Sequence, residues 1–476
     1  MQHSKQQIKS GFIWSALDSF GSKALGLVIS LVLANLLGPS VYGLIAMLTI
    51  FIAIAQVFVN SGFSSALIRK VNRSEKDYAT TFYFSVVVAS FCYLILFLSA
   101  PSISRFYGES DLISLVRIIS LTIIIETFAI IPRTKLSVTL DFKKQAKANL
   151  IALLFSGAVG LTLAFNGYGV WALVFQQITN ATVSVIMFNL LSPWKPVEKF
   201  CKKAFVELFD FGSKLLASSL LDTVYNNIYG LIIGKTFSAG QLGIFNQAKT
   251  LSHMPAMTIT GVIQKVTYPM FSTMQNDATR LDEAYLRTLR IAMMVVGPVM
   301  FGLCITSAQL INLLLGEKWQ DSAPLISILS MAFVLYPIHA INLNILQVKG
   351  RSDYFLKIEI IKKINITIML FLTVPLGVKA MCVGMVVTSY IAVVLNTYYT
   401  AKLSSISQYK QMLALLPILI ITMVSASIGY LVGLEVSTNW LSILVILSTA
   451  LLCYLILLLL FQKSLIIEMK SLLKGA

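Results

Sequence analysis

Residues 441–461 read LSILVILSTALLCYLILLLLF, an apolar run without a charged residue. About 20 such residues are enough for an α-helix to cross the hydrocarbon core of a bilayer. Comparable apolar runs occupy residues 25–37 and 113–131. Because backbone N–H and C=O groups must be hydrogen-bonded inside lipid, repeated runs of this kind predict an all-α integral membrane protein.

The composition agrees with this interpretation and excludes several kinds of chemistry. Of the 476 residues, 57% are hydrophobic and 12% are charged, whereas a soluble domain has about a quarter charged residues. The first ten residues are polar, so we interpret the apolar stretch after them as a membrane helix and not as a cleaved signal peptide. The five cysteines form no CxxC pair, so no metal site and no cofactor are expected. Without a GxxxxGK[ST] loop, ATP hydrolysis is not expected.

Hydropathy and helix-breaking residues divide the chain into about 14 spans. Spans seven and eight are the least hydrophobic. The spans cover approximately residues 11–37, 41–66, 78–104, 111–132, 146–166, 170–192, 205–234, 240–272, 284–312, 320–346, 355–375, 380–401, 411–433 and 439–461.

The basic residues predict the orientation of these spans. If both termini are cytoplasmic, the outer turns hold only Arg105, Lys235, Lys318 and Lys379, while the inner segments hold most of the remaining lysines and arginines. Such asymmetry is the positive-inside pattern of inner-membrane proteins. It also explains the net charge of +17 without nucleic acid as a partner. The outer turns are short, which argues against a membrane polymerase or ligase with an outer catalytic loop.

Two short patterns occur twice in the chain. FGSK occupies residues 20–23 and 211–214, and GPSVYG at 38–43 parallels SAGQLG at 238–243, although the two pairs align only with a gap of nine residues. With the basic linker after span six, these patterns predict an N-lobe at 1–192, a linker at 193–204 and a C-lobe at 205–403. Residues 404–476 then form two extra spans and a cytoplasmic tail. Parallel repeats place a substrate site at their interface near the midplane.

Several short motifs carry a family resemblance. They are LANLLGP at 33–39 with Tyr42-Gly43, SGF at 61–63 with ALIR at 66–69, YPMF at 268–271 with QND at 275–277, LGEKW at 315–319 with Pro324-Leu325, and KGR at 349–351. In order and spacing the chain resembles the polysaccharide transporters of the multidrug/oligosaccharidyl-lipid/polysaccharide flippase superfamily. The resemblance covers about residues 8–400, and it is closer to the branch that handles colanic acid, teichuronic acid and similar exopolysaccharides.

The resemblance implies two six-helix lobes in a V shape, a central cavity and alternating access. The implied cargo is an oligosaccharide repeat unit carried on undecaprenyl pyrophosphate, destined for O-antigen, capsule or exopolysaccharide. Implied partners are membrane lipids and, as an open question, the polymerase and chain-length regulator of the same pathway. A monomer in the bacterial inner membrane is expected.

Ionisable groups inside a span are costly and usually face a cavity or a partner. A cationic cavity would suit a pyrophosphate head group, because ammonium groups make charge-assisted hydrogen bonds to phosphate oxygens. The candidates for this cavity are Lys23, Lys214, Lys249 and Lys265. For Lys214 the alternative is a structural ion pair with Asp210, four residues earlier on the same helix.

Other polar residues within spans complete the set of candidates. Side chains that could line the cavity and bind sugar hydroxyls, or that could join helices, are Gln56, Asn60, Tyr225, Asn226 and Asn227. Carboxylates that could couple transport to H⁺ or Na⁺ are Asp18, Asp222 and Glu126, with a structural ion pair between Asp18 and Lys23 as the alternative. We expect no catalytic residues.

The sequence therefore predicts a flippase that moves a lipid-linked oligosaccharide to the outer leaflet, with ion coupling left open. One alternative is a cation-coupled multidrug antiporter of the same superfamily, which would favour an acidic cavity, whereas the charged residues within these spans are mainly basic. The other alternative is a membrane enzyme of polysaccharide assembly.

Overall fold

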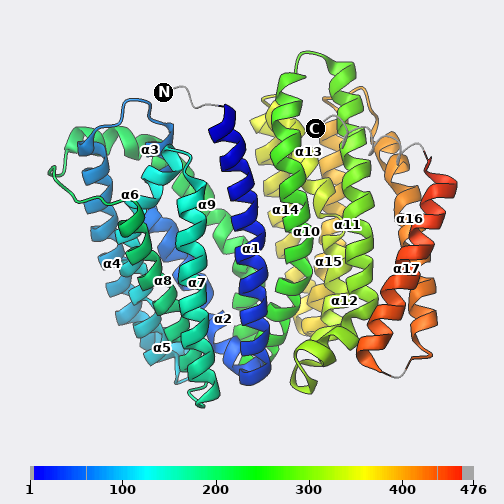
Figure 1. The fold of residues 1–476 in the computed structure, drawn as a ribbon, viewed down its shortest axis with the longest axis horizontal. Helices are drawn as coiled ribbons and strands as arrows, with labels where there is room; N and C mark the ends of the chain where they lie inside the picture. The colour runs from blue at the N-terminus through cyan, green and yellow to red at the C-terminus, as the bar shows by residue number, and fades with distance from the viewer. Residues whose placement is uncertain (1–4, 61, 437, 464–476) are drawn as a thin grey trace. The chain divides into compact units, whose positions relative to one another are not determined.

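The computed structural model describes residues 5–60, 62–436 and 438–463, with side chains from Gly21 onward (Figure 1). The described residues are almost entirely helical and contain no strand. The helices form 14 segments long enough to cross a membrane, in the order of the predicted spans, which confirms the all-α membrane fold.

Packing divides the chain into two compact units, residues 1–243 and 244–476. The helices of the first unit are α1 (Lys5–Leu37), α2 (Pro39–Asn60), α3 (Phe63–Arg69), α4 (Glu75–Tyr107), α5 (Leu112–Ile119), α6 (Leu121–Val138), α7 (Phe142–Phe165), α8 (Val170–Leu191), α9 (Lys202–Thr236) and the first residues of α10 (Ala239–Thr273). The second unit holds the rest of α10, α11 (Ala278–Leu314), η1 (Glu317–Trp319), α12 (Ser322–Phe333), α13 (Tyr336–Val348), α14 (Ser352–Thr373), η2 (Val374–Leu376), α15 (Val378–Ala401), α16 (Gln408–Gly433) and α17 (Asn439–Phe461).

Three spans are each made of two consecutive helices, α2–α3, α5–α6 and α12–α13. The first break lies next to Gly62, whose φ of 70° is a conformation that glycine adopts at little cost. The third precedes Pro337, which stands in the first turn of α13, where a proline costs no helical hydrogen bond. Local backbone chemistry therefore sets two of these breaks.

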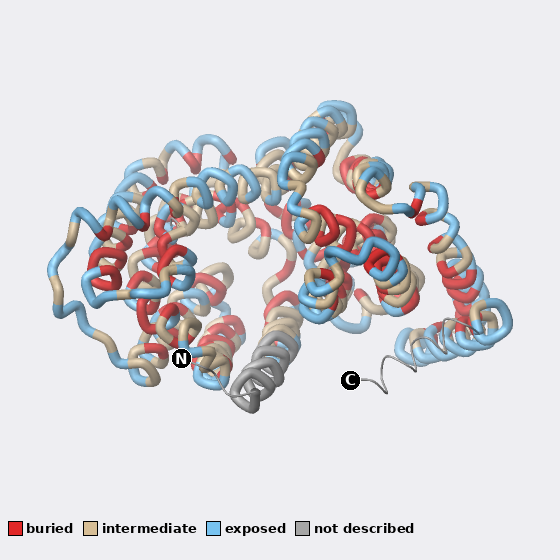
Figure 2. The backbone as a smooth tube through the Cα atoms, turned by 90° about the horizontal axis from the view of Figure 1, so that it is seen from above, coloured by how far each residue is buried: buried red, intermediate tan, exposed pale blue. Residues whose placement is uncertain are grey.

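Ten of the described helical segments are long and apolar enough to span a membrane by composition alone. The segments outside this group are α1, α9, α10 and α14. Two of these, α9 and α10, form spans seven and eight, the least hydrophobic in the sequence. Within each unit the buried residues lie on helix faces turned toward neighbouring helices, and the outward faces are exposed (Figure 2).

The first residues of α2 and α10 cross in direct backbone contact. A Cβ atom on Gly43 would overlap the carbonyl of Ala239, and a Cβ atom on Gly243 would overlap the carbonyl of Pro39. The contact is reciprocal, because positions 39 and 43 correspond to 239 and 243 in the sequence repeat. Reciprocal contacts of this kind are typical of segments related by a two-fold axis. The repeat at GPSVYG and SAGQLG therefore has a structural counterpart.

The second copy of FGSK has a packing role of its own. A Cβ atom on Gly62 would lie 2.8 Å from the carbonyl oxygen of Gly212, so the break after α2 is in close contact with α9. The neighbouring Phe211 ring lies under the guanidinium of Arg69, 4.4 Å from its centroid. Gly212 therefore provides the space in which the end of α2 meets α9.

An ion-pair cluster at the end of α3 strengthens this contact. The Nζ atom of Lys70 lies 2.9 Å from Asp77 of α4 and 3.0 Å from Glu207 of α9. Burial works against the charge on Lys70, but these hydrogen bonds outweigh it and raise the pKa of the ammonium group above its ordinary value. The ammonium group of Lys70 therefore joins the end of α3 to α4 and α9.

The boundary between the two compact units differs from the lobe boundary that the sequence repeat predicts. The helix α9 packs against α2, α3 and α4, so it belongs to the same unit as the first six spans, and the boundary falls after Gly243 inside α10. The predicted linker at 193–204 also lies on the first unit, where Trp194 Nε1 donates to Glu75 at 2.9 Å. The assignment of lobes at 1–192 and 205–403 stays a prediction.

Candidate functional site

Two of the predicted polar residues meet within the first unit. Gln56 Nε2 of α2 donates to Glu126 Oε2 of α6 at 3.3 Å. Arg133 lies two helical turns after Glu126, and its guanidinium lies 4.8 Å from the centroid of the Phe188 ring. A carboxylate held by an amide in a helix interior keeps a hydrogen bond in either protonation state, because the amide can donate or accept.

The two lysines of the FGSK segments lie at different heights in their helices. Lys23 stands about four helical turns before Leu37, where α1 ends, and Lys214 stands about six turns before Thr236, where α9 ends. At 1.5 Å per residue the difference corresponds to about 12 Å along the helix axis. The two FGSK segments therefore place their lysines at different distances from the ends of their helices.

Lys214 forms the ion pair that was the structural alternative. Its Nζ atom lies 3.2 Å from Asp210 Oδ1, and the side chains of Lys214 and Asp210 are 75% and 78% exposed in the structure. Exposed pairs at this spacing contribute well under 1 kcal/mol, so the pair leaves Lys214 able to exchange Asp210 for an anionic ligand. Lys23 is half-buried on α1.

The remaining candidates lie on four helices. Asn60 is exposed at the end of α2. In α9, Asp222 and Asn226 are exposed, Tyr225 and Asn227 are half-buried, and Asn227 donates to the carbonyl of Thr223 at 2.8 Å. In the second unit, Lys265 is exposed on α10 and Lys249 is half-buried. Asp18 lies on α1, but its side chain is outside the described residues. The roles of all these residues stay predictions.

The second unit contains a buried polar network that sequence reasoning missed. The hydroxyl of Tyr285 on α11 lies 2.8 Å from the side-chain oxygens of both Asn342 on α13 and Gln411 on α16. His339 on α13 contacts Ser389 and Asn396 of α15 at 3.1 Å and 2.9 Å. The sequence shows single amide and histidine residues inside apolar spans, which could have indicated such a network. It does not show which of these residues face each other.

Replacing Tyr285 by phenylalanine is expected to lower the free energy of unfolding by about 1–3 kcal/mol, the usual cost of leaving buried polar partners unpaired. Tyr285 is fully buried. The midpoint of thermal unfolding in detergent measures the change, and Tyr268→Phe, at an exposed tyrosine of α10, is the matched control. Equal midpoints for the two variants would contradict a stabilising role for this network.

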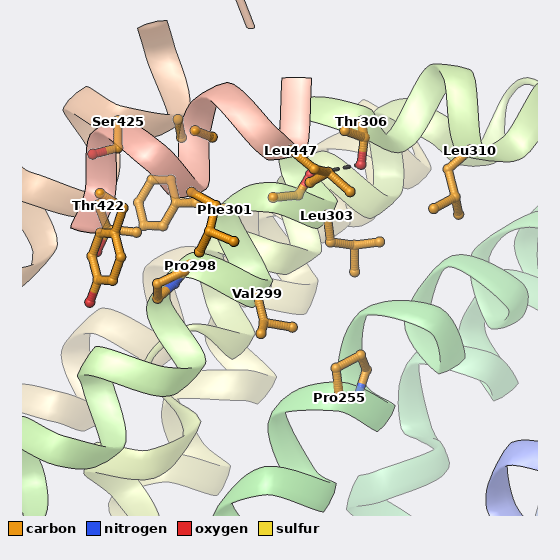
Figure 3. A pocket seen from close by; sticks show the side chains of 15 residues that line it. Pro255, Pro298, Val299, Phe301, Leu303, Thr306, Leu310, Thr422, Ser425 and Leu447 are labelled. Carbon is orange, nitrogen blue, oxygen red and sulfur yellow. Dashed lines mark hydrogen bonds between the residues drawn. The ribbon is translucent and has the colours of Figure 1, made fainter. Parts of the chain in front are cut away.

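An apolar cavity of about 400 Å³ lies in the second unit between α10, α11, α16 and α17 (Figure 3). Its side chains include Pro255, Phe301 and Leu447. The hydroxyl groups at its wall donate to backbone carbonyls, as with Thr306 to Gly302 at 2.7 Å and Tyr454 to Met294 at 2.9 Å. Because these polar groups are already hydrogen-bonded, the cavity suits a hydrocarbon chain.

Within the described residues, no group of three or more His, Cys, Asp or Glu side chains is arranged to hold a metal ion. The five cysteines are free thiols. The groups that could contact a ligand in these units are therefore amines, amides, carboxylates and apolar side chains of membrane helices.

Comparison with known proteins identifies the class. A family model described as polysaccharide biosynthesis protein matches residues 32–324. The chain is 24% identical over 350 residues to the teichuronic acid biosynthesis protein TuaB of Bacillus subtilis, covering 73% of this chain and 72% of that protein. It is 24% identical over 405 residues to the lipopolysaccharide biosynthesis protein WzxC of Escherichia coli, covering 83% and 80%.

The fold is similar to that of a solved lipid II flippase, MurJ, in an inward closed conformation. The TM-score is 0.78 at 16% identity, over 95% of this chain and all of that chain. Together these matches show a multi-span membrane protein of a polysaccharide biosynthesis family, with a fold similar to that of a known flippase. The chain belongs to the polysaccharide biosynthesis protein family.

Proposed function

We propose that this protein moves a lipid-linked oligosaccharide repeat unit, carried on undecaprenyl pyrophosphate, from the cytoplasmic to the outer leaflet of a bacterial inner membrane. The match of residues 32–324 to the polysaccharide biosynthesis family carries this proposal. The repeat unit would serve a surface polysaccharide such as O-antigen, capsule or exopolysaccharide. Both termini would be cytoplasmic, as the distribution of basic residues predicts.

The charges within the helices suit an anionic head group. Lys23 lies on α1 and Lys214 on α9, the first helix of each sequence repeat, and Lys249 and Lys265 lie on α10. Ammonium groups bind phosphate oxygens strongly where little water competes. The polar run of α9 around Tyr225 and Asn226 offers hydrogen bonds to sugar hydroxyls. An isoprenoid tail would remain in lipid or enter the apolar cavity beside Pro255.

Deletion of the gene tests the proposal in the cell. We expect loss of the surface polysaccharide and accumulation of its lipid-linked repeat unit on the cytoplasmic side, both restored by the wild-type gene. Normal polysaccharide combined with increased sensitivity to cationic drugs would instead support the multidrug antiporter.

Alternating access driven by H⁺ or Na⁺ forms part of this proposal, with Glu126, Asp222 and Asp18 as the coupling candidates. Glu126 is the best defined of the three, because its hydrogen bond to Gln56 joins α2 to α6. A carboxylate in this position can change charge during a cycle without losing its partner.

The variant Glu126→Gln is expected to preserve the protein but to remove the response of flipping to an imposed pH or Na⁺ gradient. Glutamine retains a hydrogen-bonding group toward Gln56 and cannot ionise. Flipping in proteoliposomes with and without a gradient measures the effect. Asp111→Asn, at an exposed turn before α5, is the control. A gradient response equal to wild type in Glu126→Gln would remove Glu126 from the coupling mechanism.

A further inference from the structure

Within the second unit, α10 has one packed side and one open side. On the packed side, Gln264 Nε2 donates to Asn344 Oδ1 of α13 at 3.2 Å, and Phe271 is fully buried. The centroid of the His253 ring lies 4.8 Å from that of the Phe333 ring of α12. These contacts fix the rotation of α10 about its axis, so they also determine which residues lie on its open side.

The open side of α10 consists of two neighbouring stripes of different chemistry. At 3.6 residues per turn, an apolar stripe holds Val262, Val266 and Pro269, and the stripe beside it, which we call the polar stripe, holds Met257, Gly261, Lys265, Tyr268 and Ser272. The apolar stripe suits contact with lipid chains. The ammonium group of Lys265 is costly in lipid and needs water or a ligand. The polar stripe is therefore the side of α10 that suits a polar ligand.

Two side chains of the polar stripe are available to a ligand. Tyr268 is 41% exposed, and Lys265 is exposed as well. Among the residues that the structure describes, neither side chain forms a hydrogen bond, an ion pair or a ring contact. No acidic residue occurs in α10, so no carboxylate of this helix competes with an anionic ligand for Lys265. An aromatic ring and an ammonium group thus stand side by side without partners.

Gly261 leaves open space next to these two groups. A Cβ atom at position 261 would meet nothing within 4 Å, so no neighbouring side chain fills the place. Helical side chains lean toward the N-terminus, which directs Lys265 over Gly261 and Tyr268 toward Lys265. From Gly261 to Tyr268 the helix rises about 11 Å at 1.5 Å per residue. This length is comparable to that of a sugar joined to a diphosphate.

We propose that Tyr268 is a specificity-determining residue that stacks on the first sugar of the lipid-linked repeat unit, while Lys265 holds the adjoining diphosphate above Gly261. This inference rests on the proposed function and adds the class of sugar that the site accepts. That class is a pyranose of gluco or galacto configuration, whose C–H groups form an apolar patch on a ring face. The face of an aromatic ring is electron-rich and attracts such C–H groups, so the ring of Tyr268 selects for the sugar and Lys265 for the phosphate.

Binding of short-chain ligands to the full chain in detergent tests this subsite. Citronellyl diphosphate is compared with the same diphosphate carrying glucose or galactose, and isothermal titration calorimetry gives each Kd. Tyr268→Ala should weaken the tighter-binding glycosylated ligand about fivefold, which corresponds to about 1 kcal/mol, and should leave citronellyl diphosphate unchanged. Tyr268→Phe keeps the ring and should bind all ligands as wild type does. Gly261→Leu fills the place of the diphosphate and should weaken the glycosylated and sugar-free ligands alike.

The controls separate a sugar subsite from other roles of an exposed tyrosine. Tyr409→Ala removes a tyrosine that is 72% exposed at the start of α16 and should not change any Kd. If Tyr268→Ala does not fold, Tyr268→Leu keeps an apolar side chain without a ring and takes its place. An unchanged Kd for both glycosylated ligands, or an equal loss for the sugar-free ligand, would overturn the subsite.

Failure of the subsite can be told apart from failure of the proposed function. If Tyr268→Ala binds the glycosylated ligands as wild type does, while wild type flips the repeat unit in proteoliposomes, only the subsite is overturned, and Tyr268 is assigned to anchoring at the membrane interface. Wild-type protein that binds neither the glycosylated nor the sugar-free ligands would contradict both.

Discussion

Replacing Lys23 by alanine is expected to abolish surface polysaccharide while the protein remains inserted in the membrane. Lys23 lies in the interior of α1, about four helical turns before its end, where an ammonium group is costly unless it serves a ligand or a partner. A hydrogen bond to a charged group contributes about 1.5–3 kcal/mol, so its loss weakens head-group binding roughly 10- to 100-fold. Polysaccharide on the cell surface and protein in the membrane fraction are measured together.

Two further variants make this result specific. Lys23→Arg keeps the charge and should retain part of the activity, although arginine has a different shape. Lys199→Ala removes an exposed lysine from the linker and should have no effect. Normal polysaccharide in Lys23→Ala would show that the head group does not depend on this lysine and would contradict the cationic site.

Substitution at the crossing of α2 and α10 is expected to have the largest effect on stability. A Cβ atom at position 43 or 243 would overlap a backbone carbonyl of the opposite helix, and a carbonyl cannot move aside as a flexible side chain can. Overpacking usually costs about 1–3 kcal/mol, and we expect Gly43→Ala and Gly243→Ala to reach at least the upper part of that range. The midpoint of thermal unfolding in detergent measures the loss for each variant.

A glycine on the same helix is the matched control for this prediction. Gly261 also lies in α10, but a Cβ atom there would meet nothing within 4 Å. Gly261→Ala should therefore stabilise the protein, since alanine is favoured over glycine in a helix by about 1 kcal/mol. The double variant of Gly43 and Gly243 should lose less than the sum of the single losses, because both affect one contact. If Gly243→Ala and Gly261→Ala have the same midpoint of thermal unfolding, the close crossing of α2 and α10 is contradicted.

The spans were predictable from the sequence because their signal is local. A run such as residues 441–461 contains no charged residue, and α17 covers Asn439–Phe461 in the structure. Even the weaker spans, α9 and α10, could be placed, because the orientation predicted from the basic residues requires a span at each of these positions. The breaks within spans were missed at Gly62 and Pro337, since a break inside an apolar run changes its hydropathy little.

Tertiary partners could not be predicted in the same way. The sequence pairs Lys23 with Lys214 through FGSK, but Gly212 of the second copy serves the close contact with Gly62, and the two lysines lie at different depths. The contact between Gln56 and Glu126 depends on how α2 and α6 are rotated about their axes, which hydropathy does not determine. The packing of α9 against α2, α3 and α4 within the first unit depends in the same way on which helix faces meet.

The central claim is that this chain moves a lipid-linked oligosaccharide across a bilayer. Purified protein in proteoliposomes that contain an undecaprenyl-pyrophosphate-linked repeat unit tests it most directly, with a membrane-impermeant glycosidase or lectin reporting the fraction of glycan on the opposite leaflet. We predict that wild-type protein transfers the glycan faster than protein-free vesicles and that Lys23→Ala does not. Folded wild-type protein that transfers no glycan above the protein-free rate, with the repeat unit of its own pathway supplied, would contradict the account.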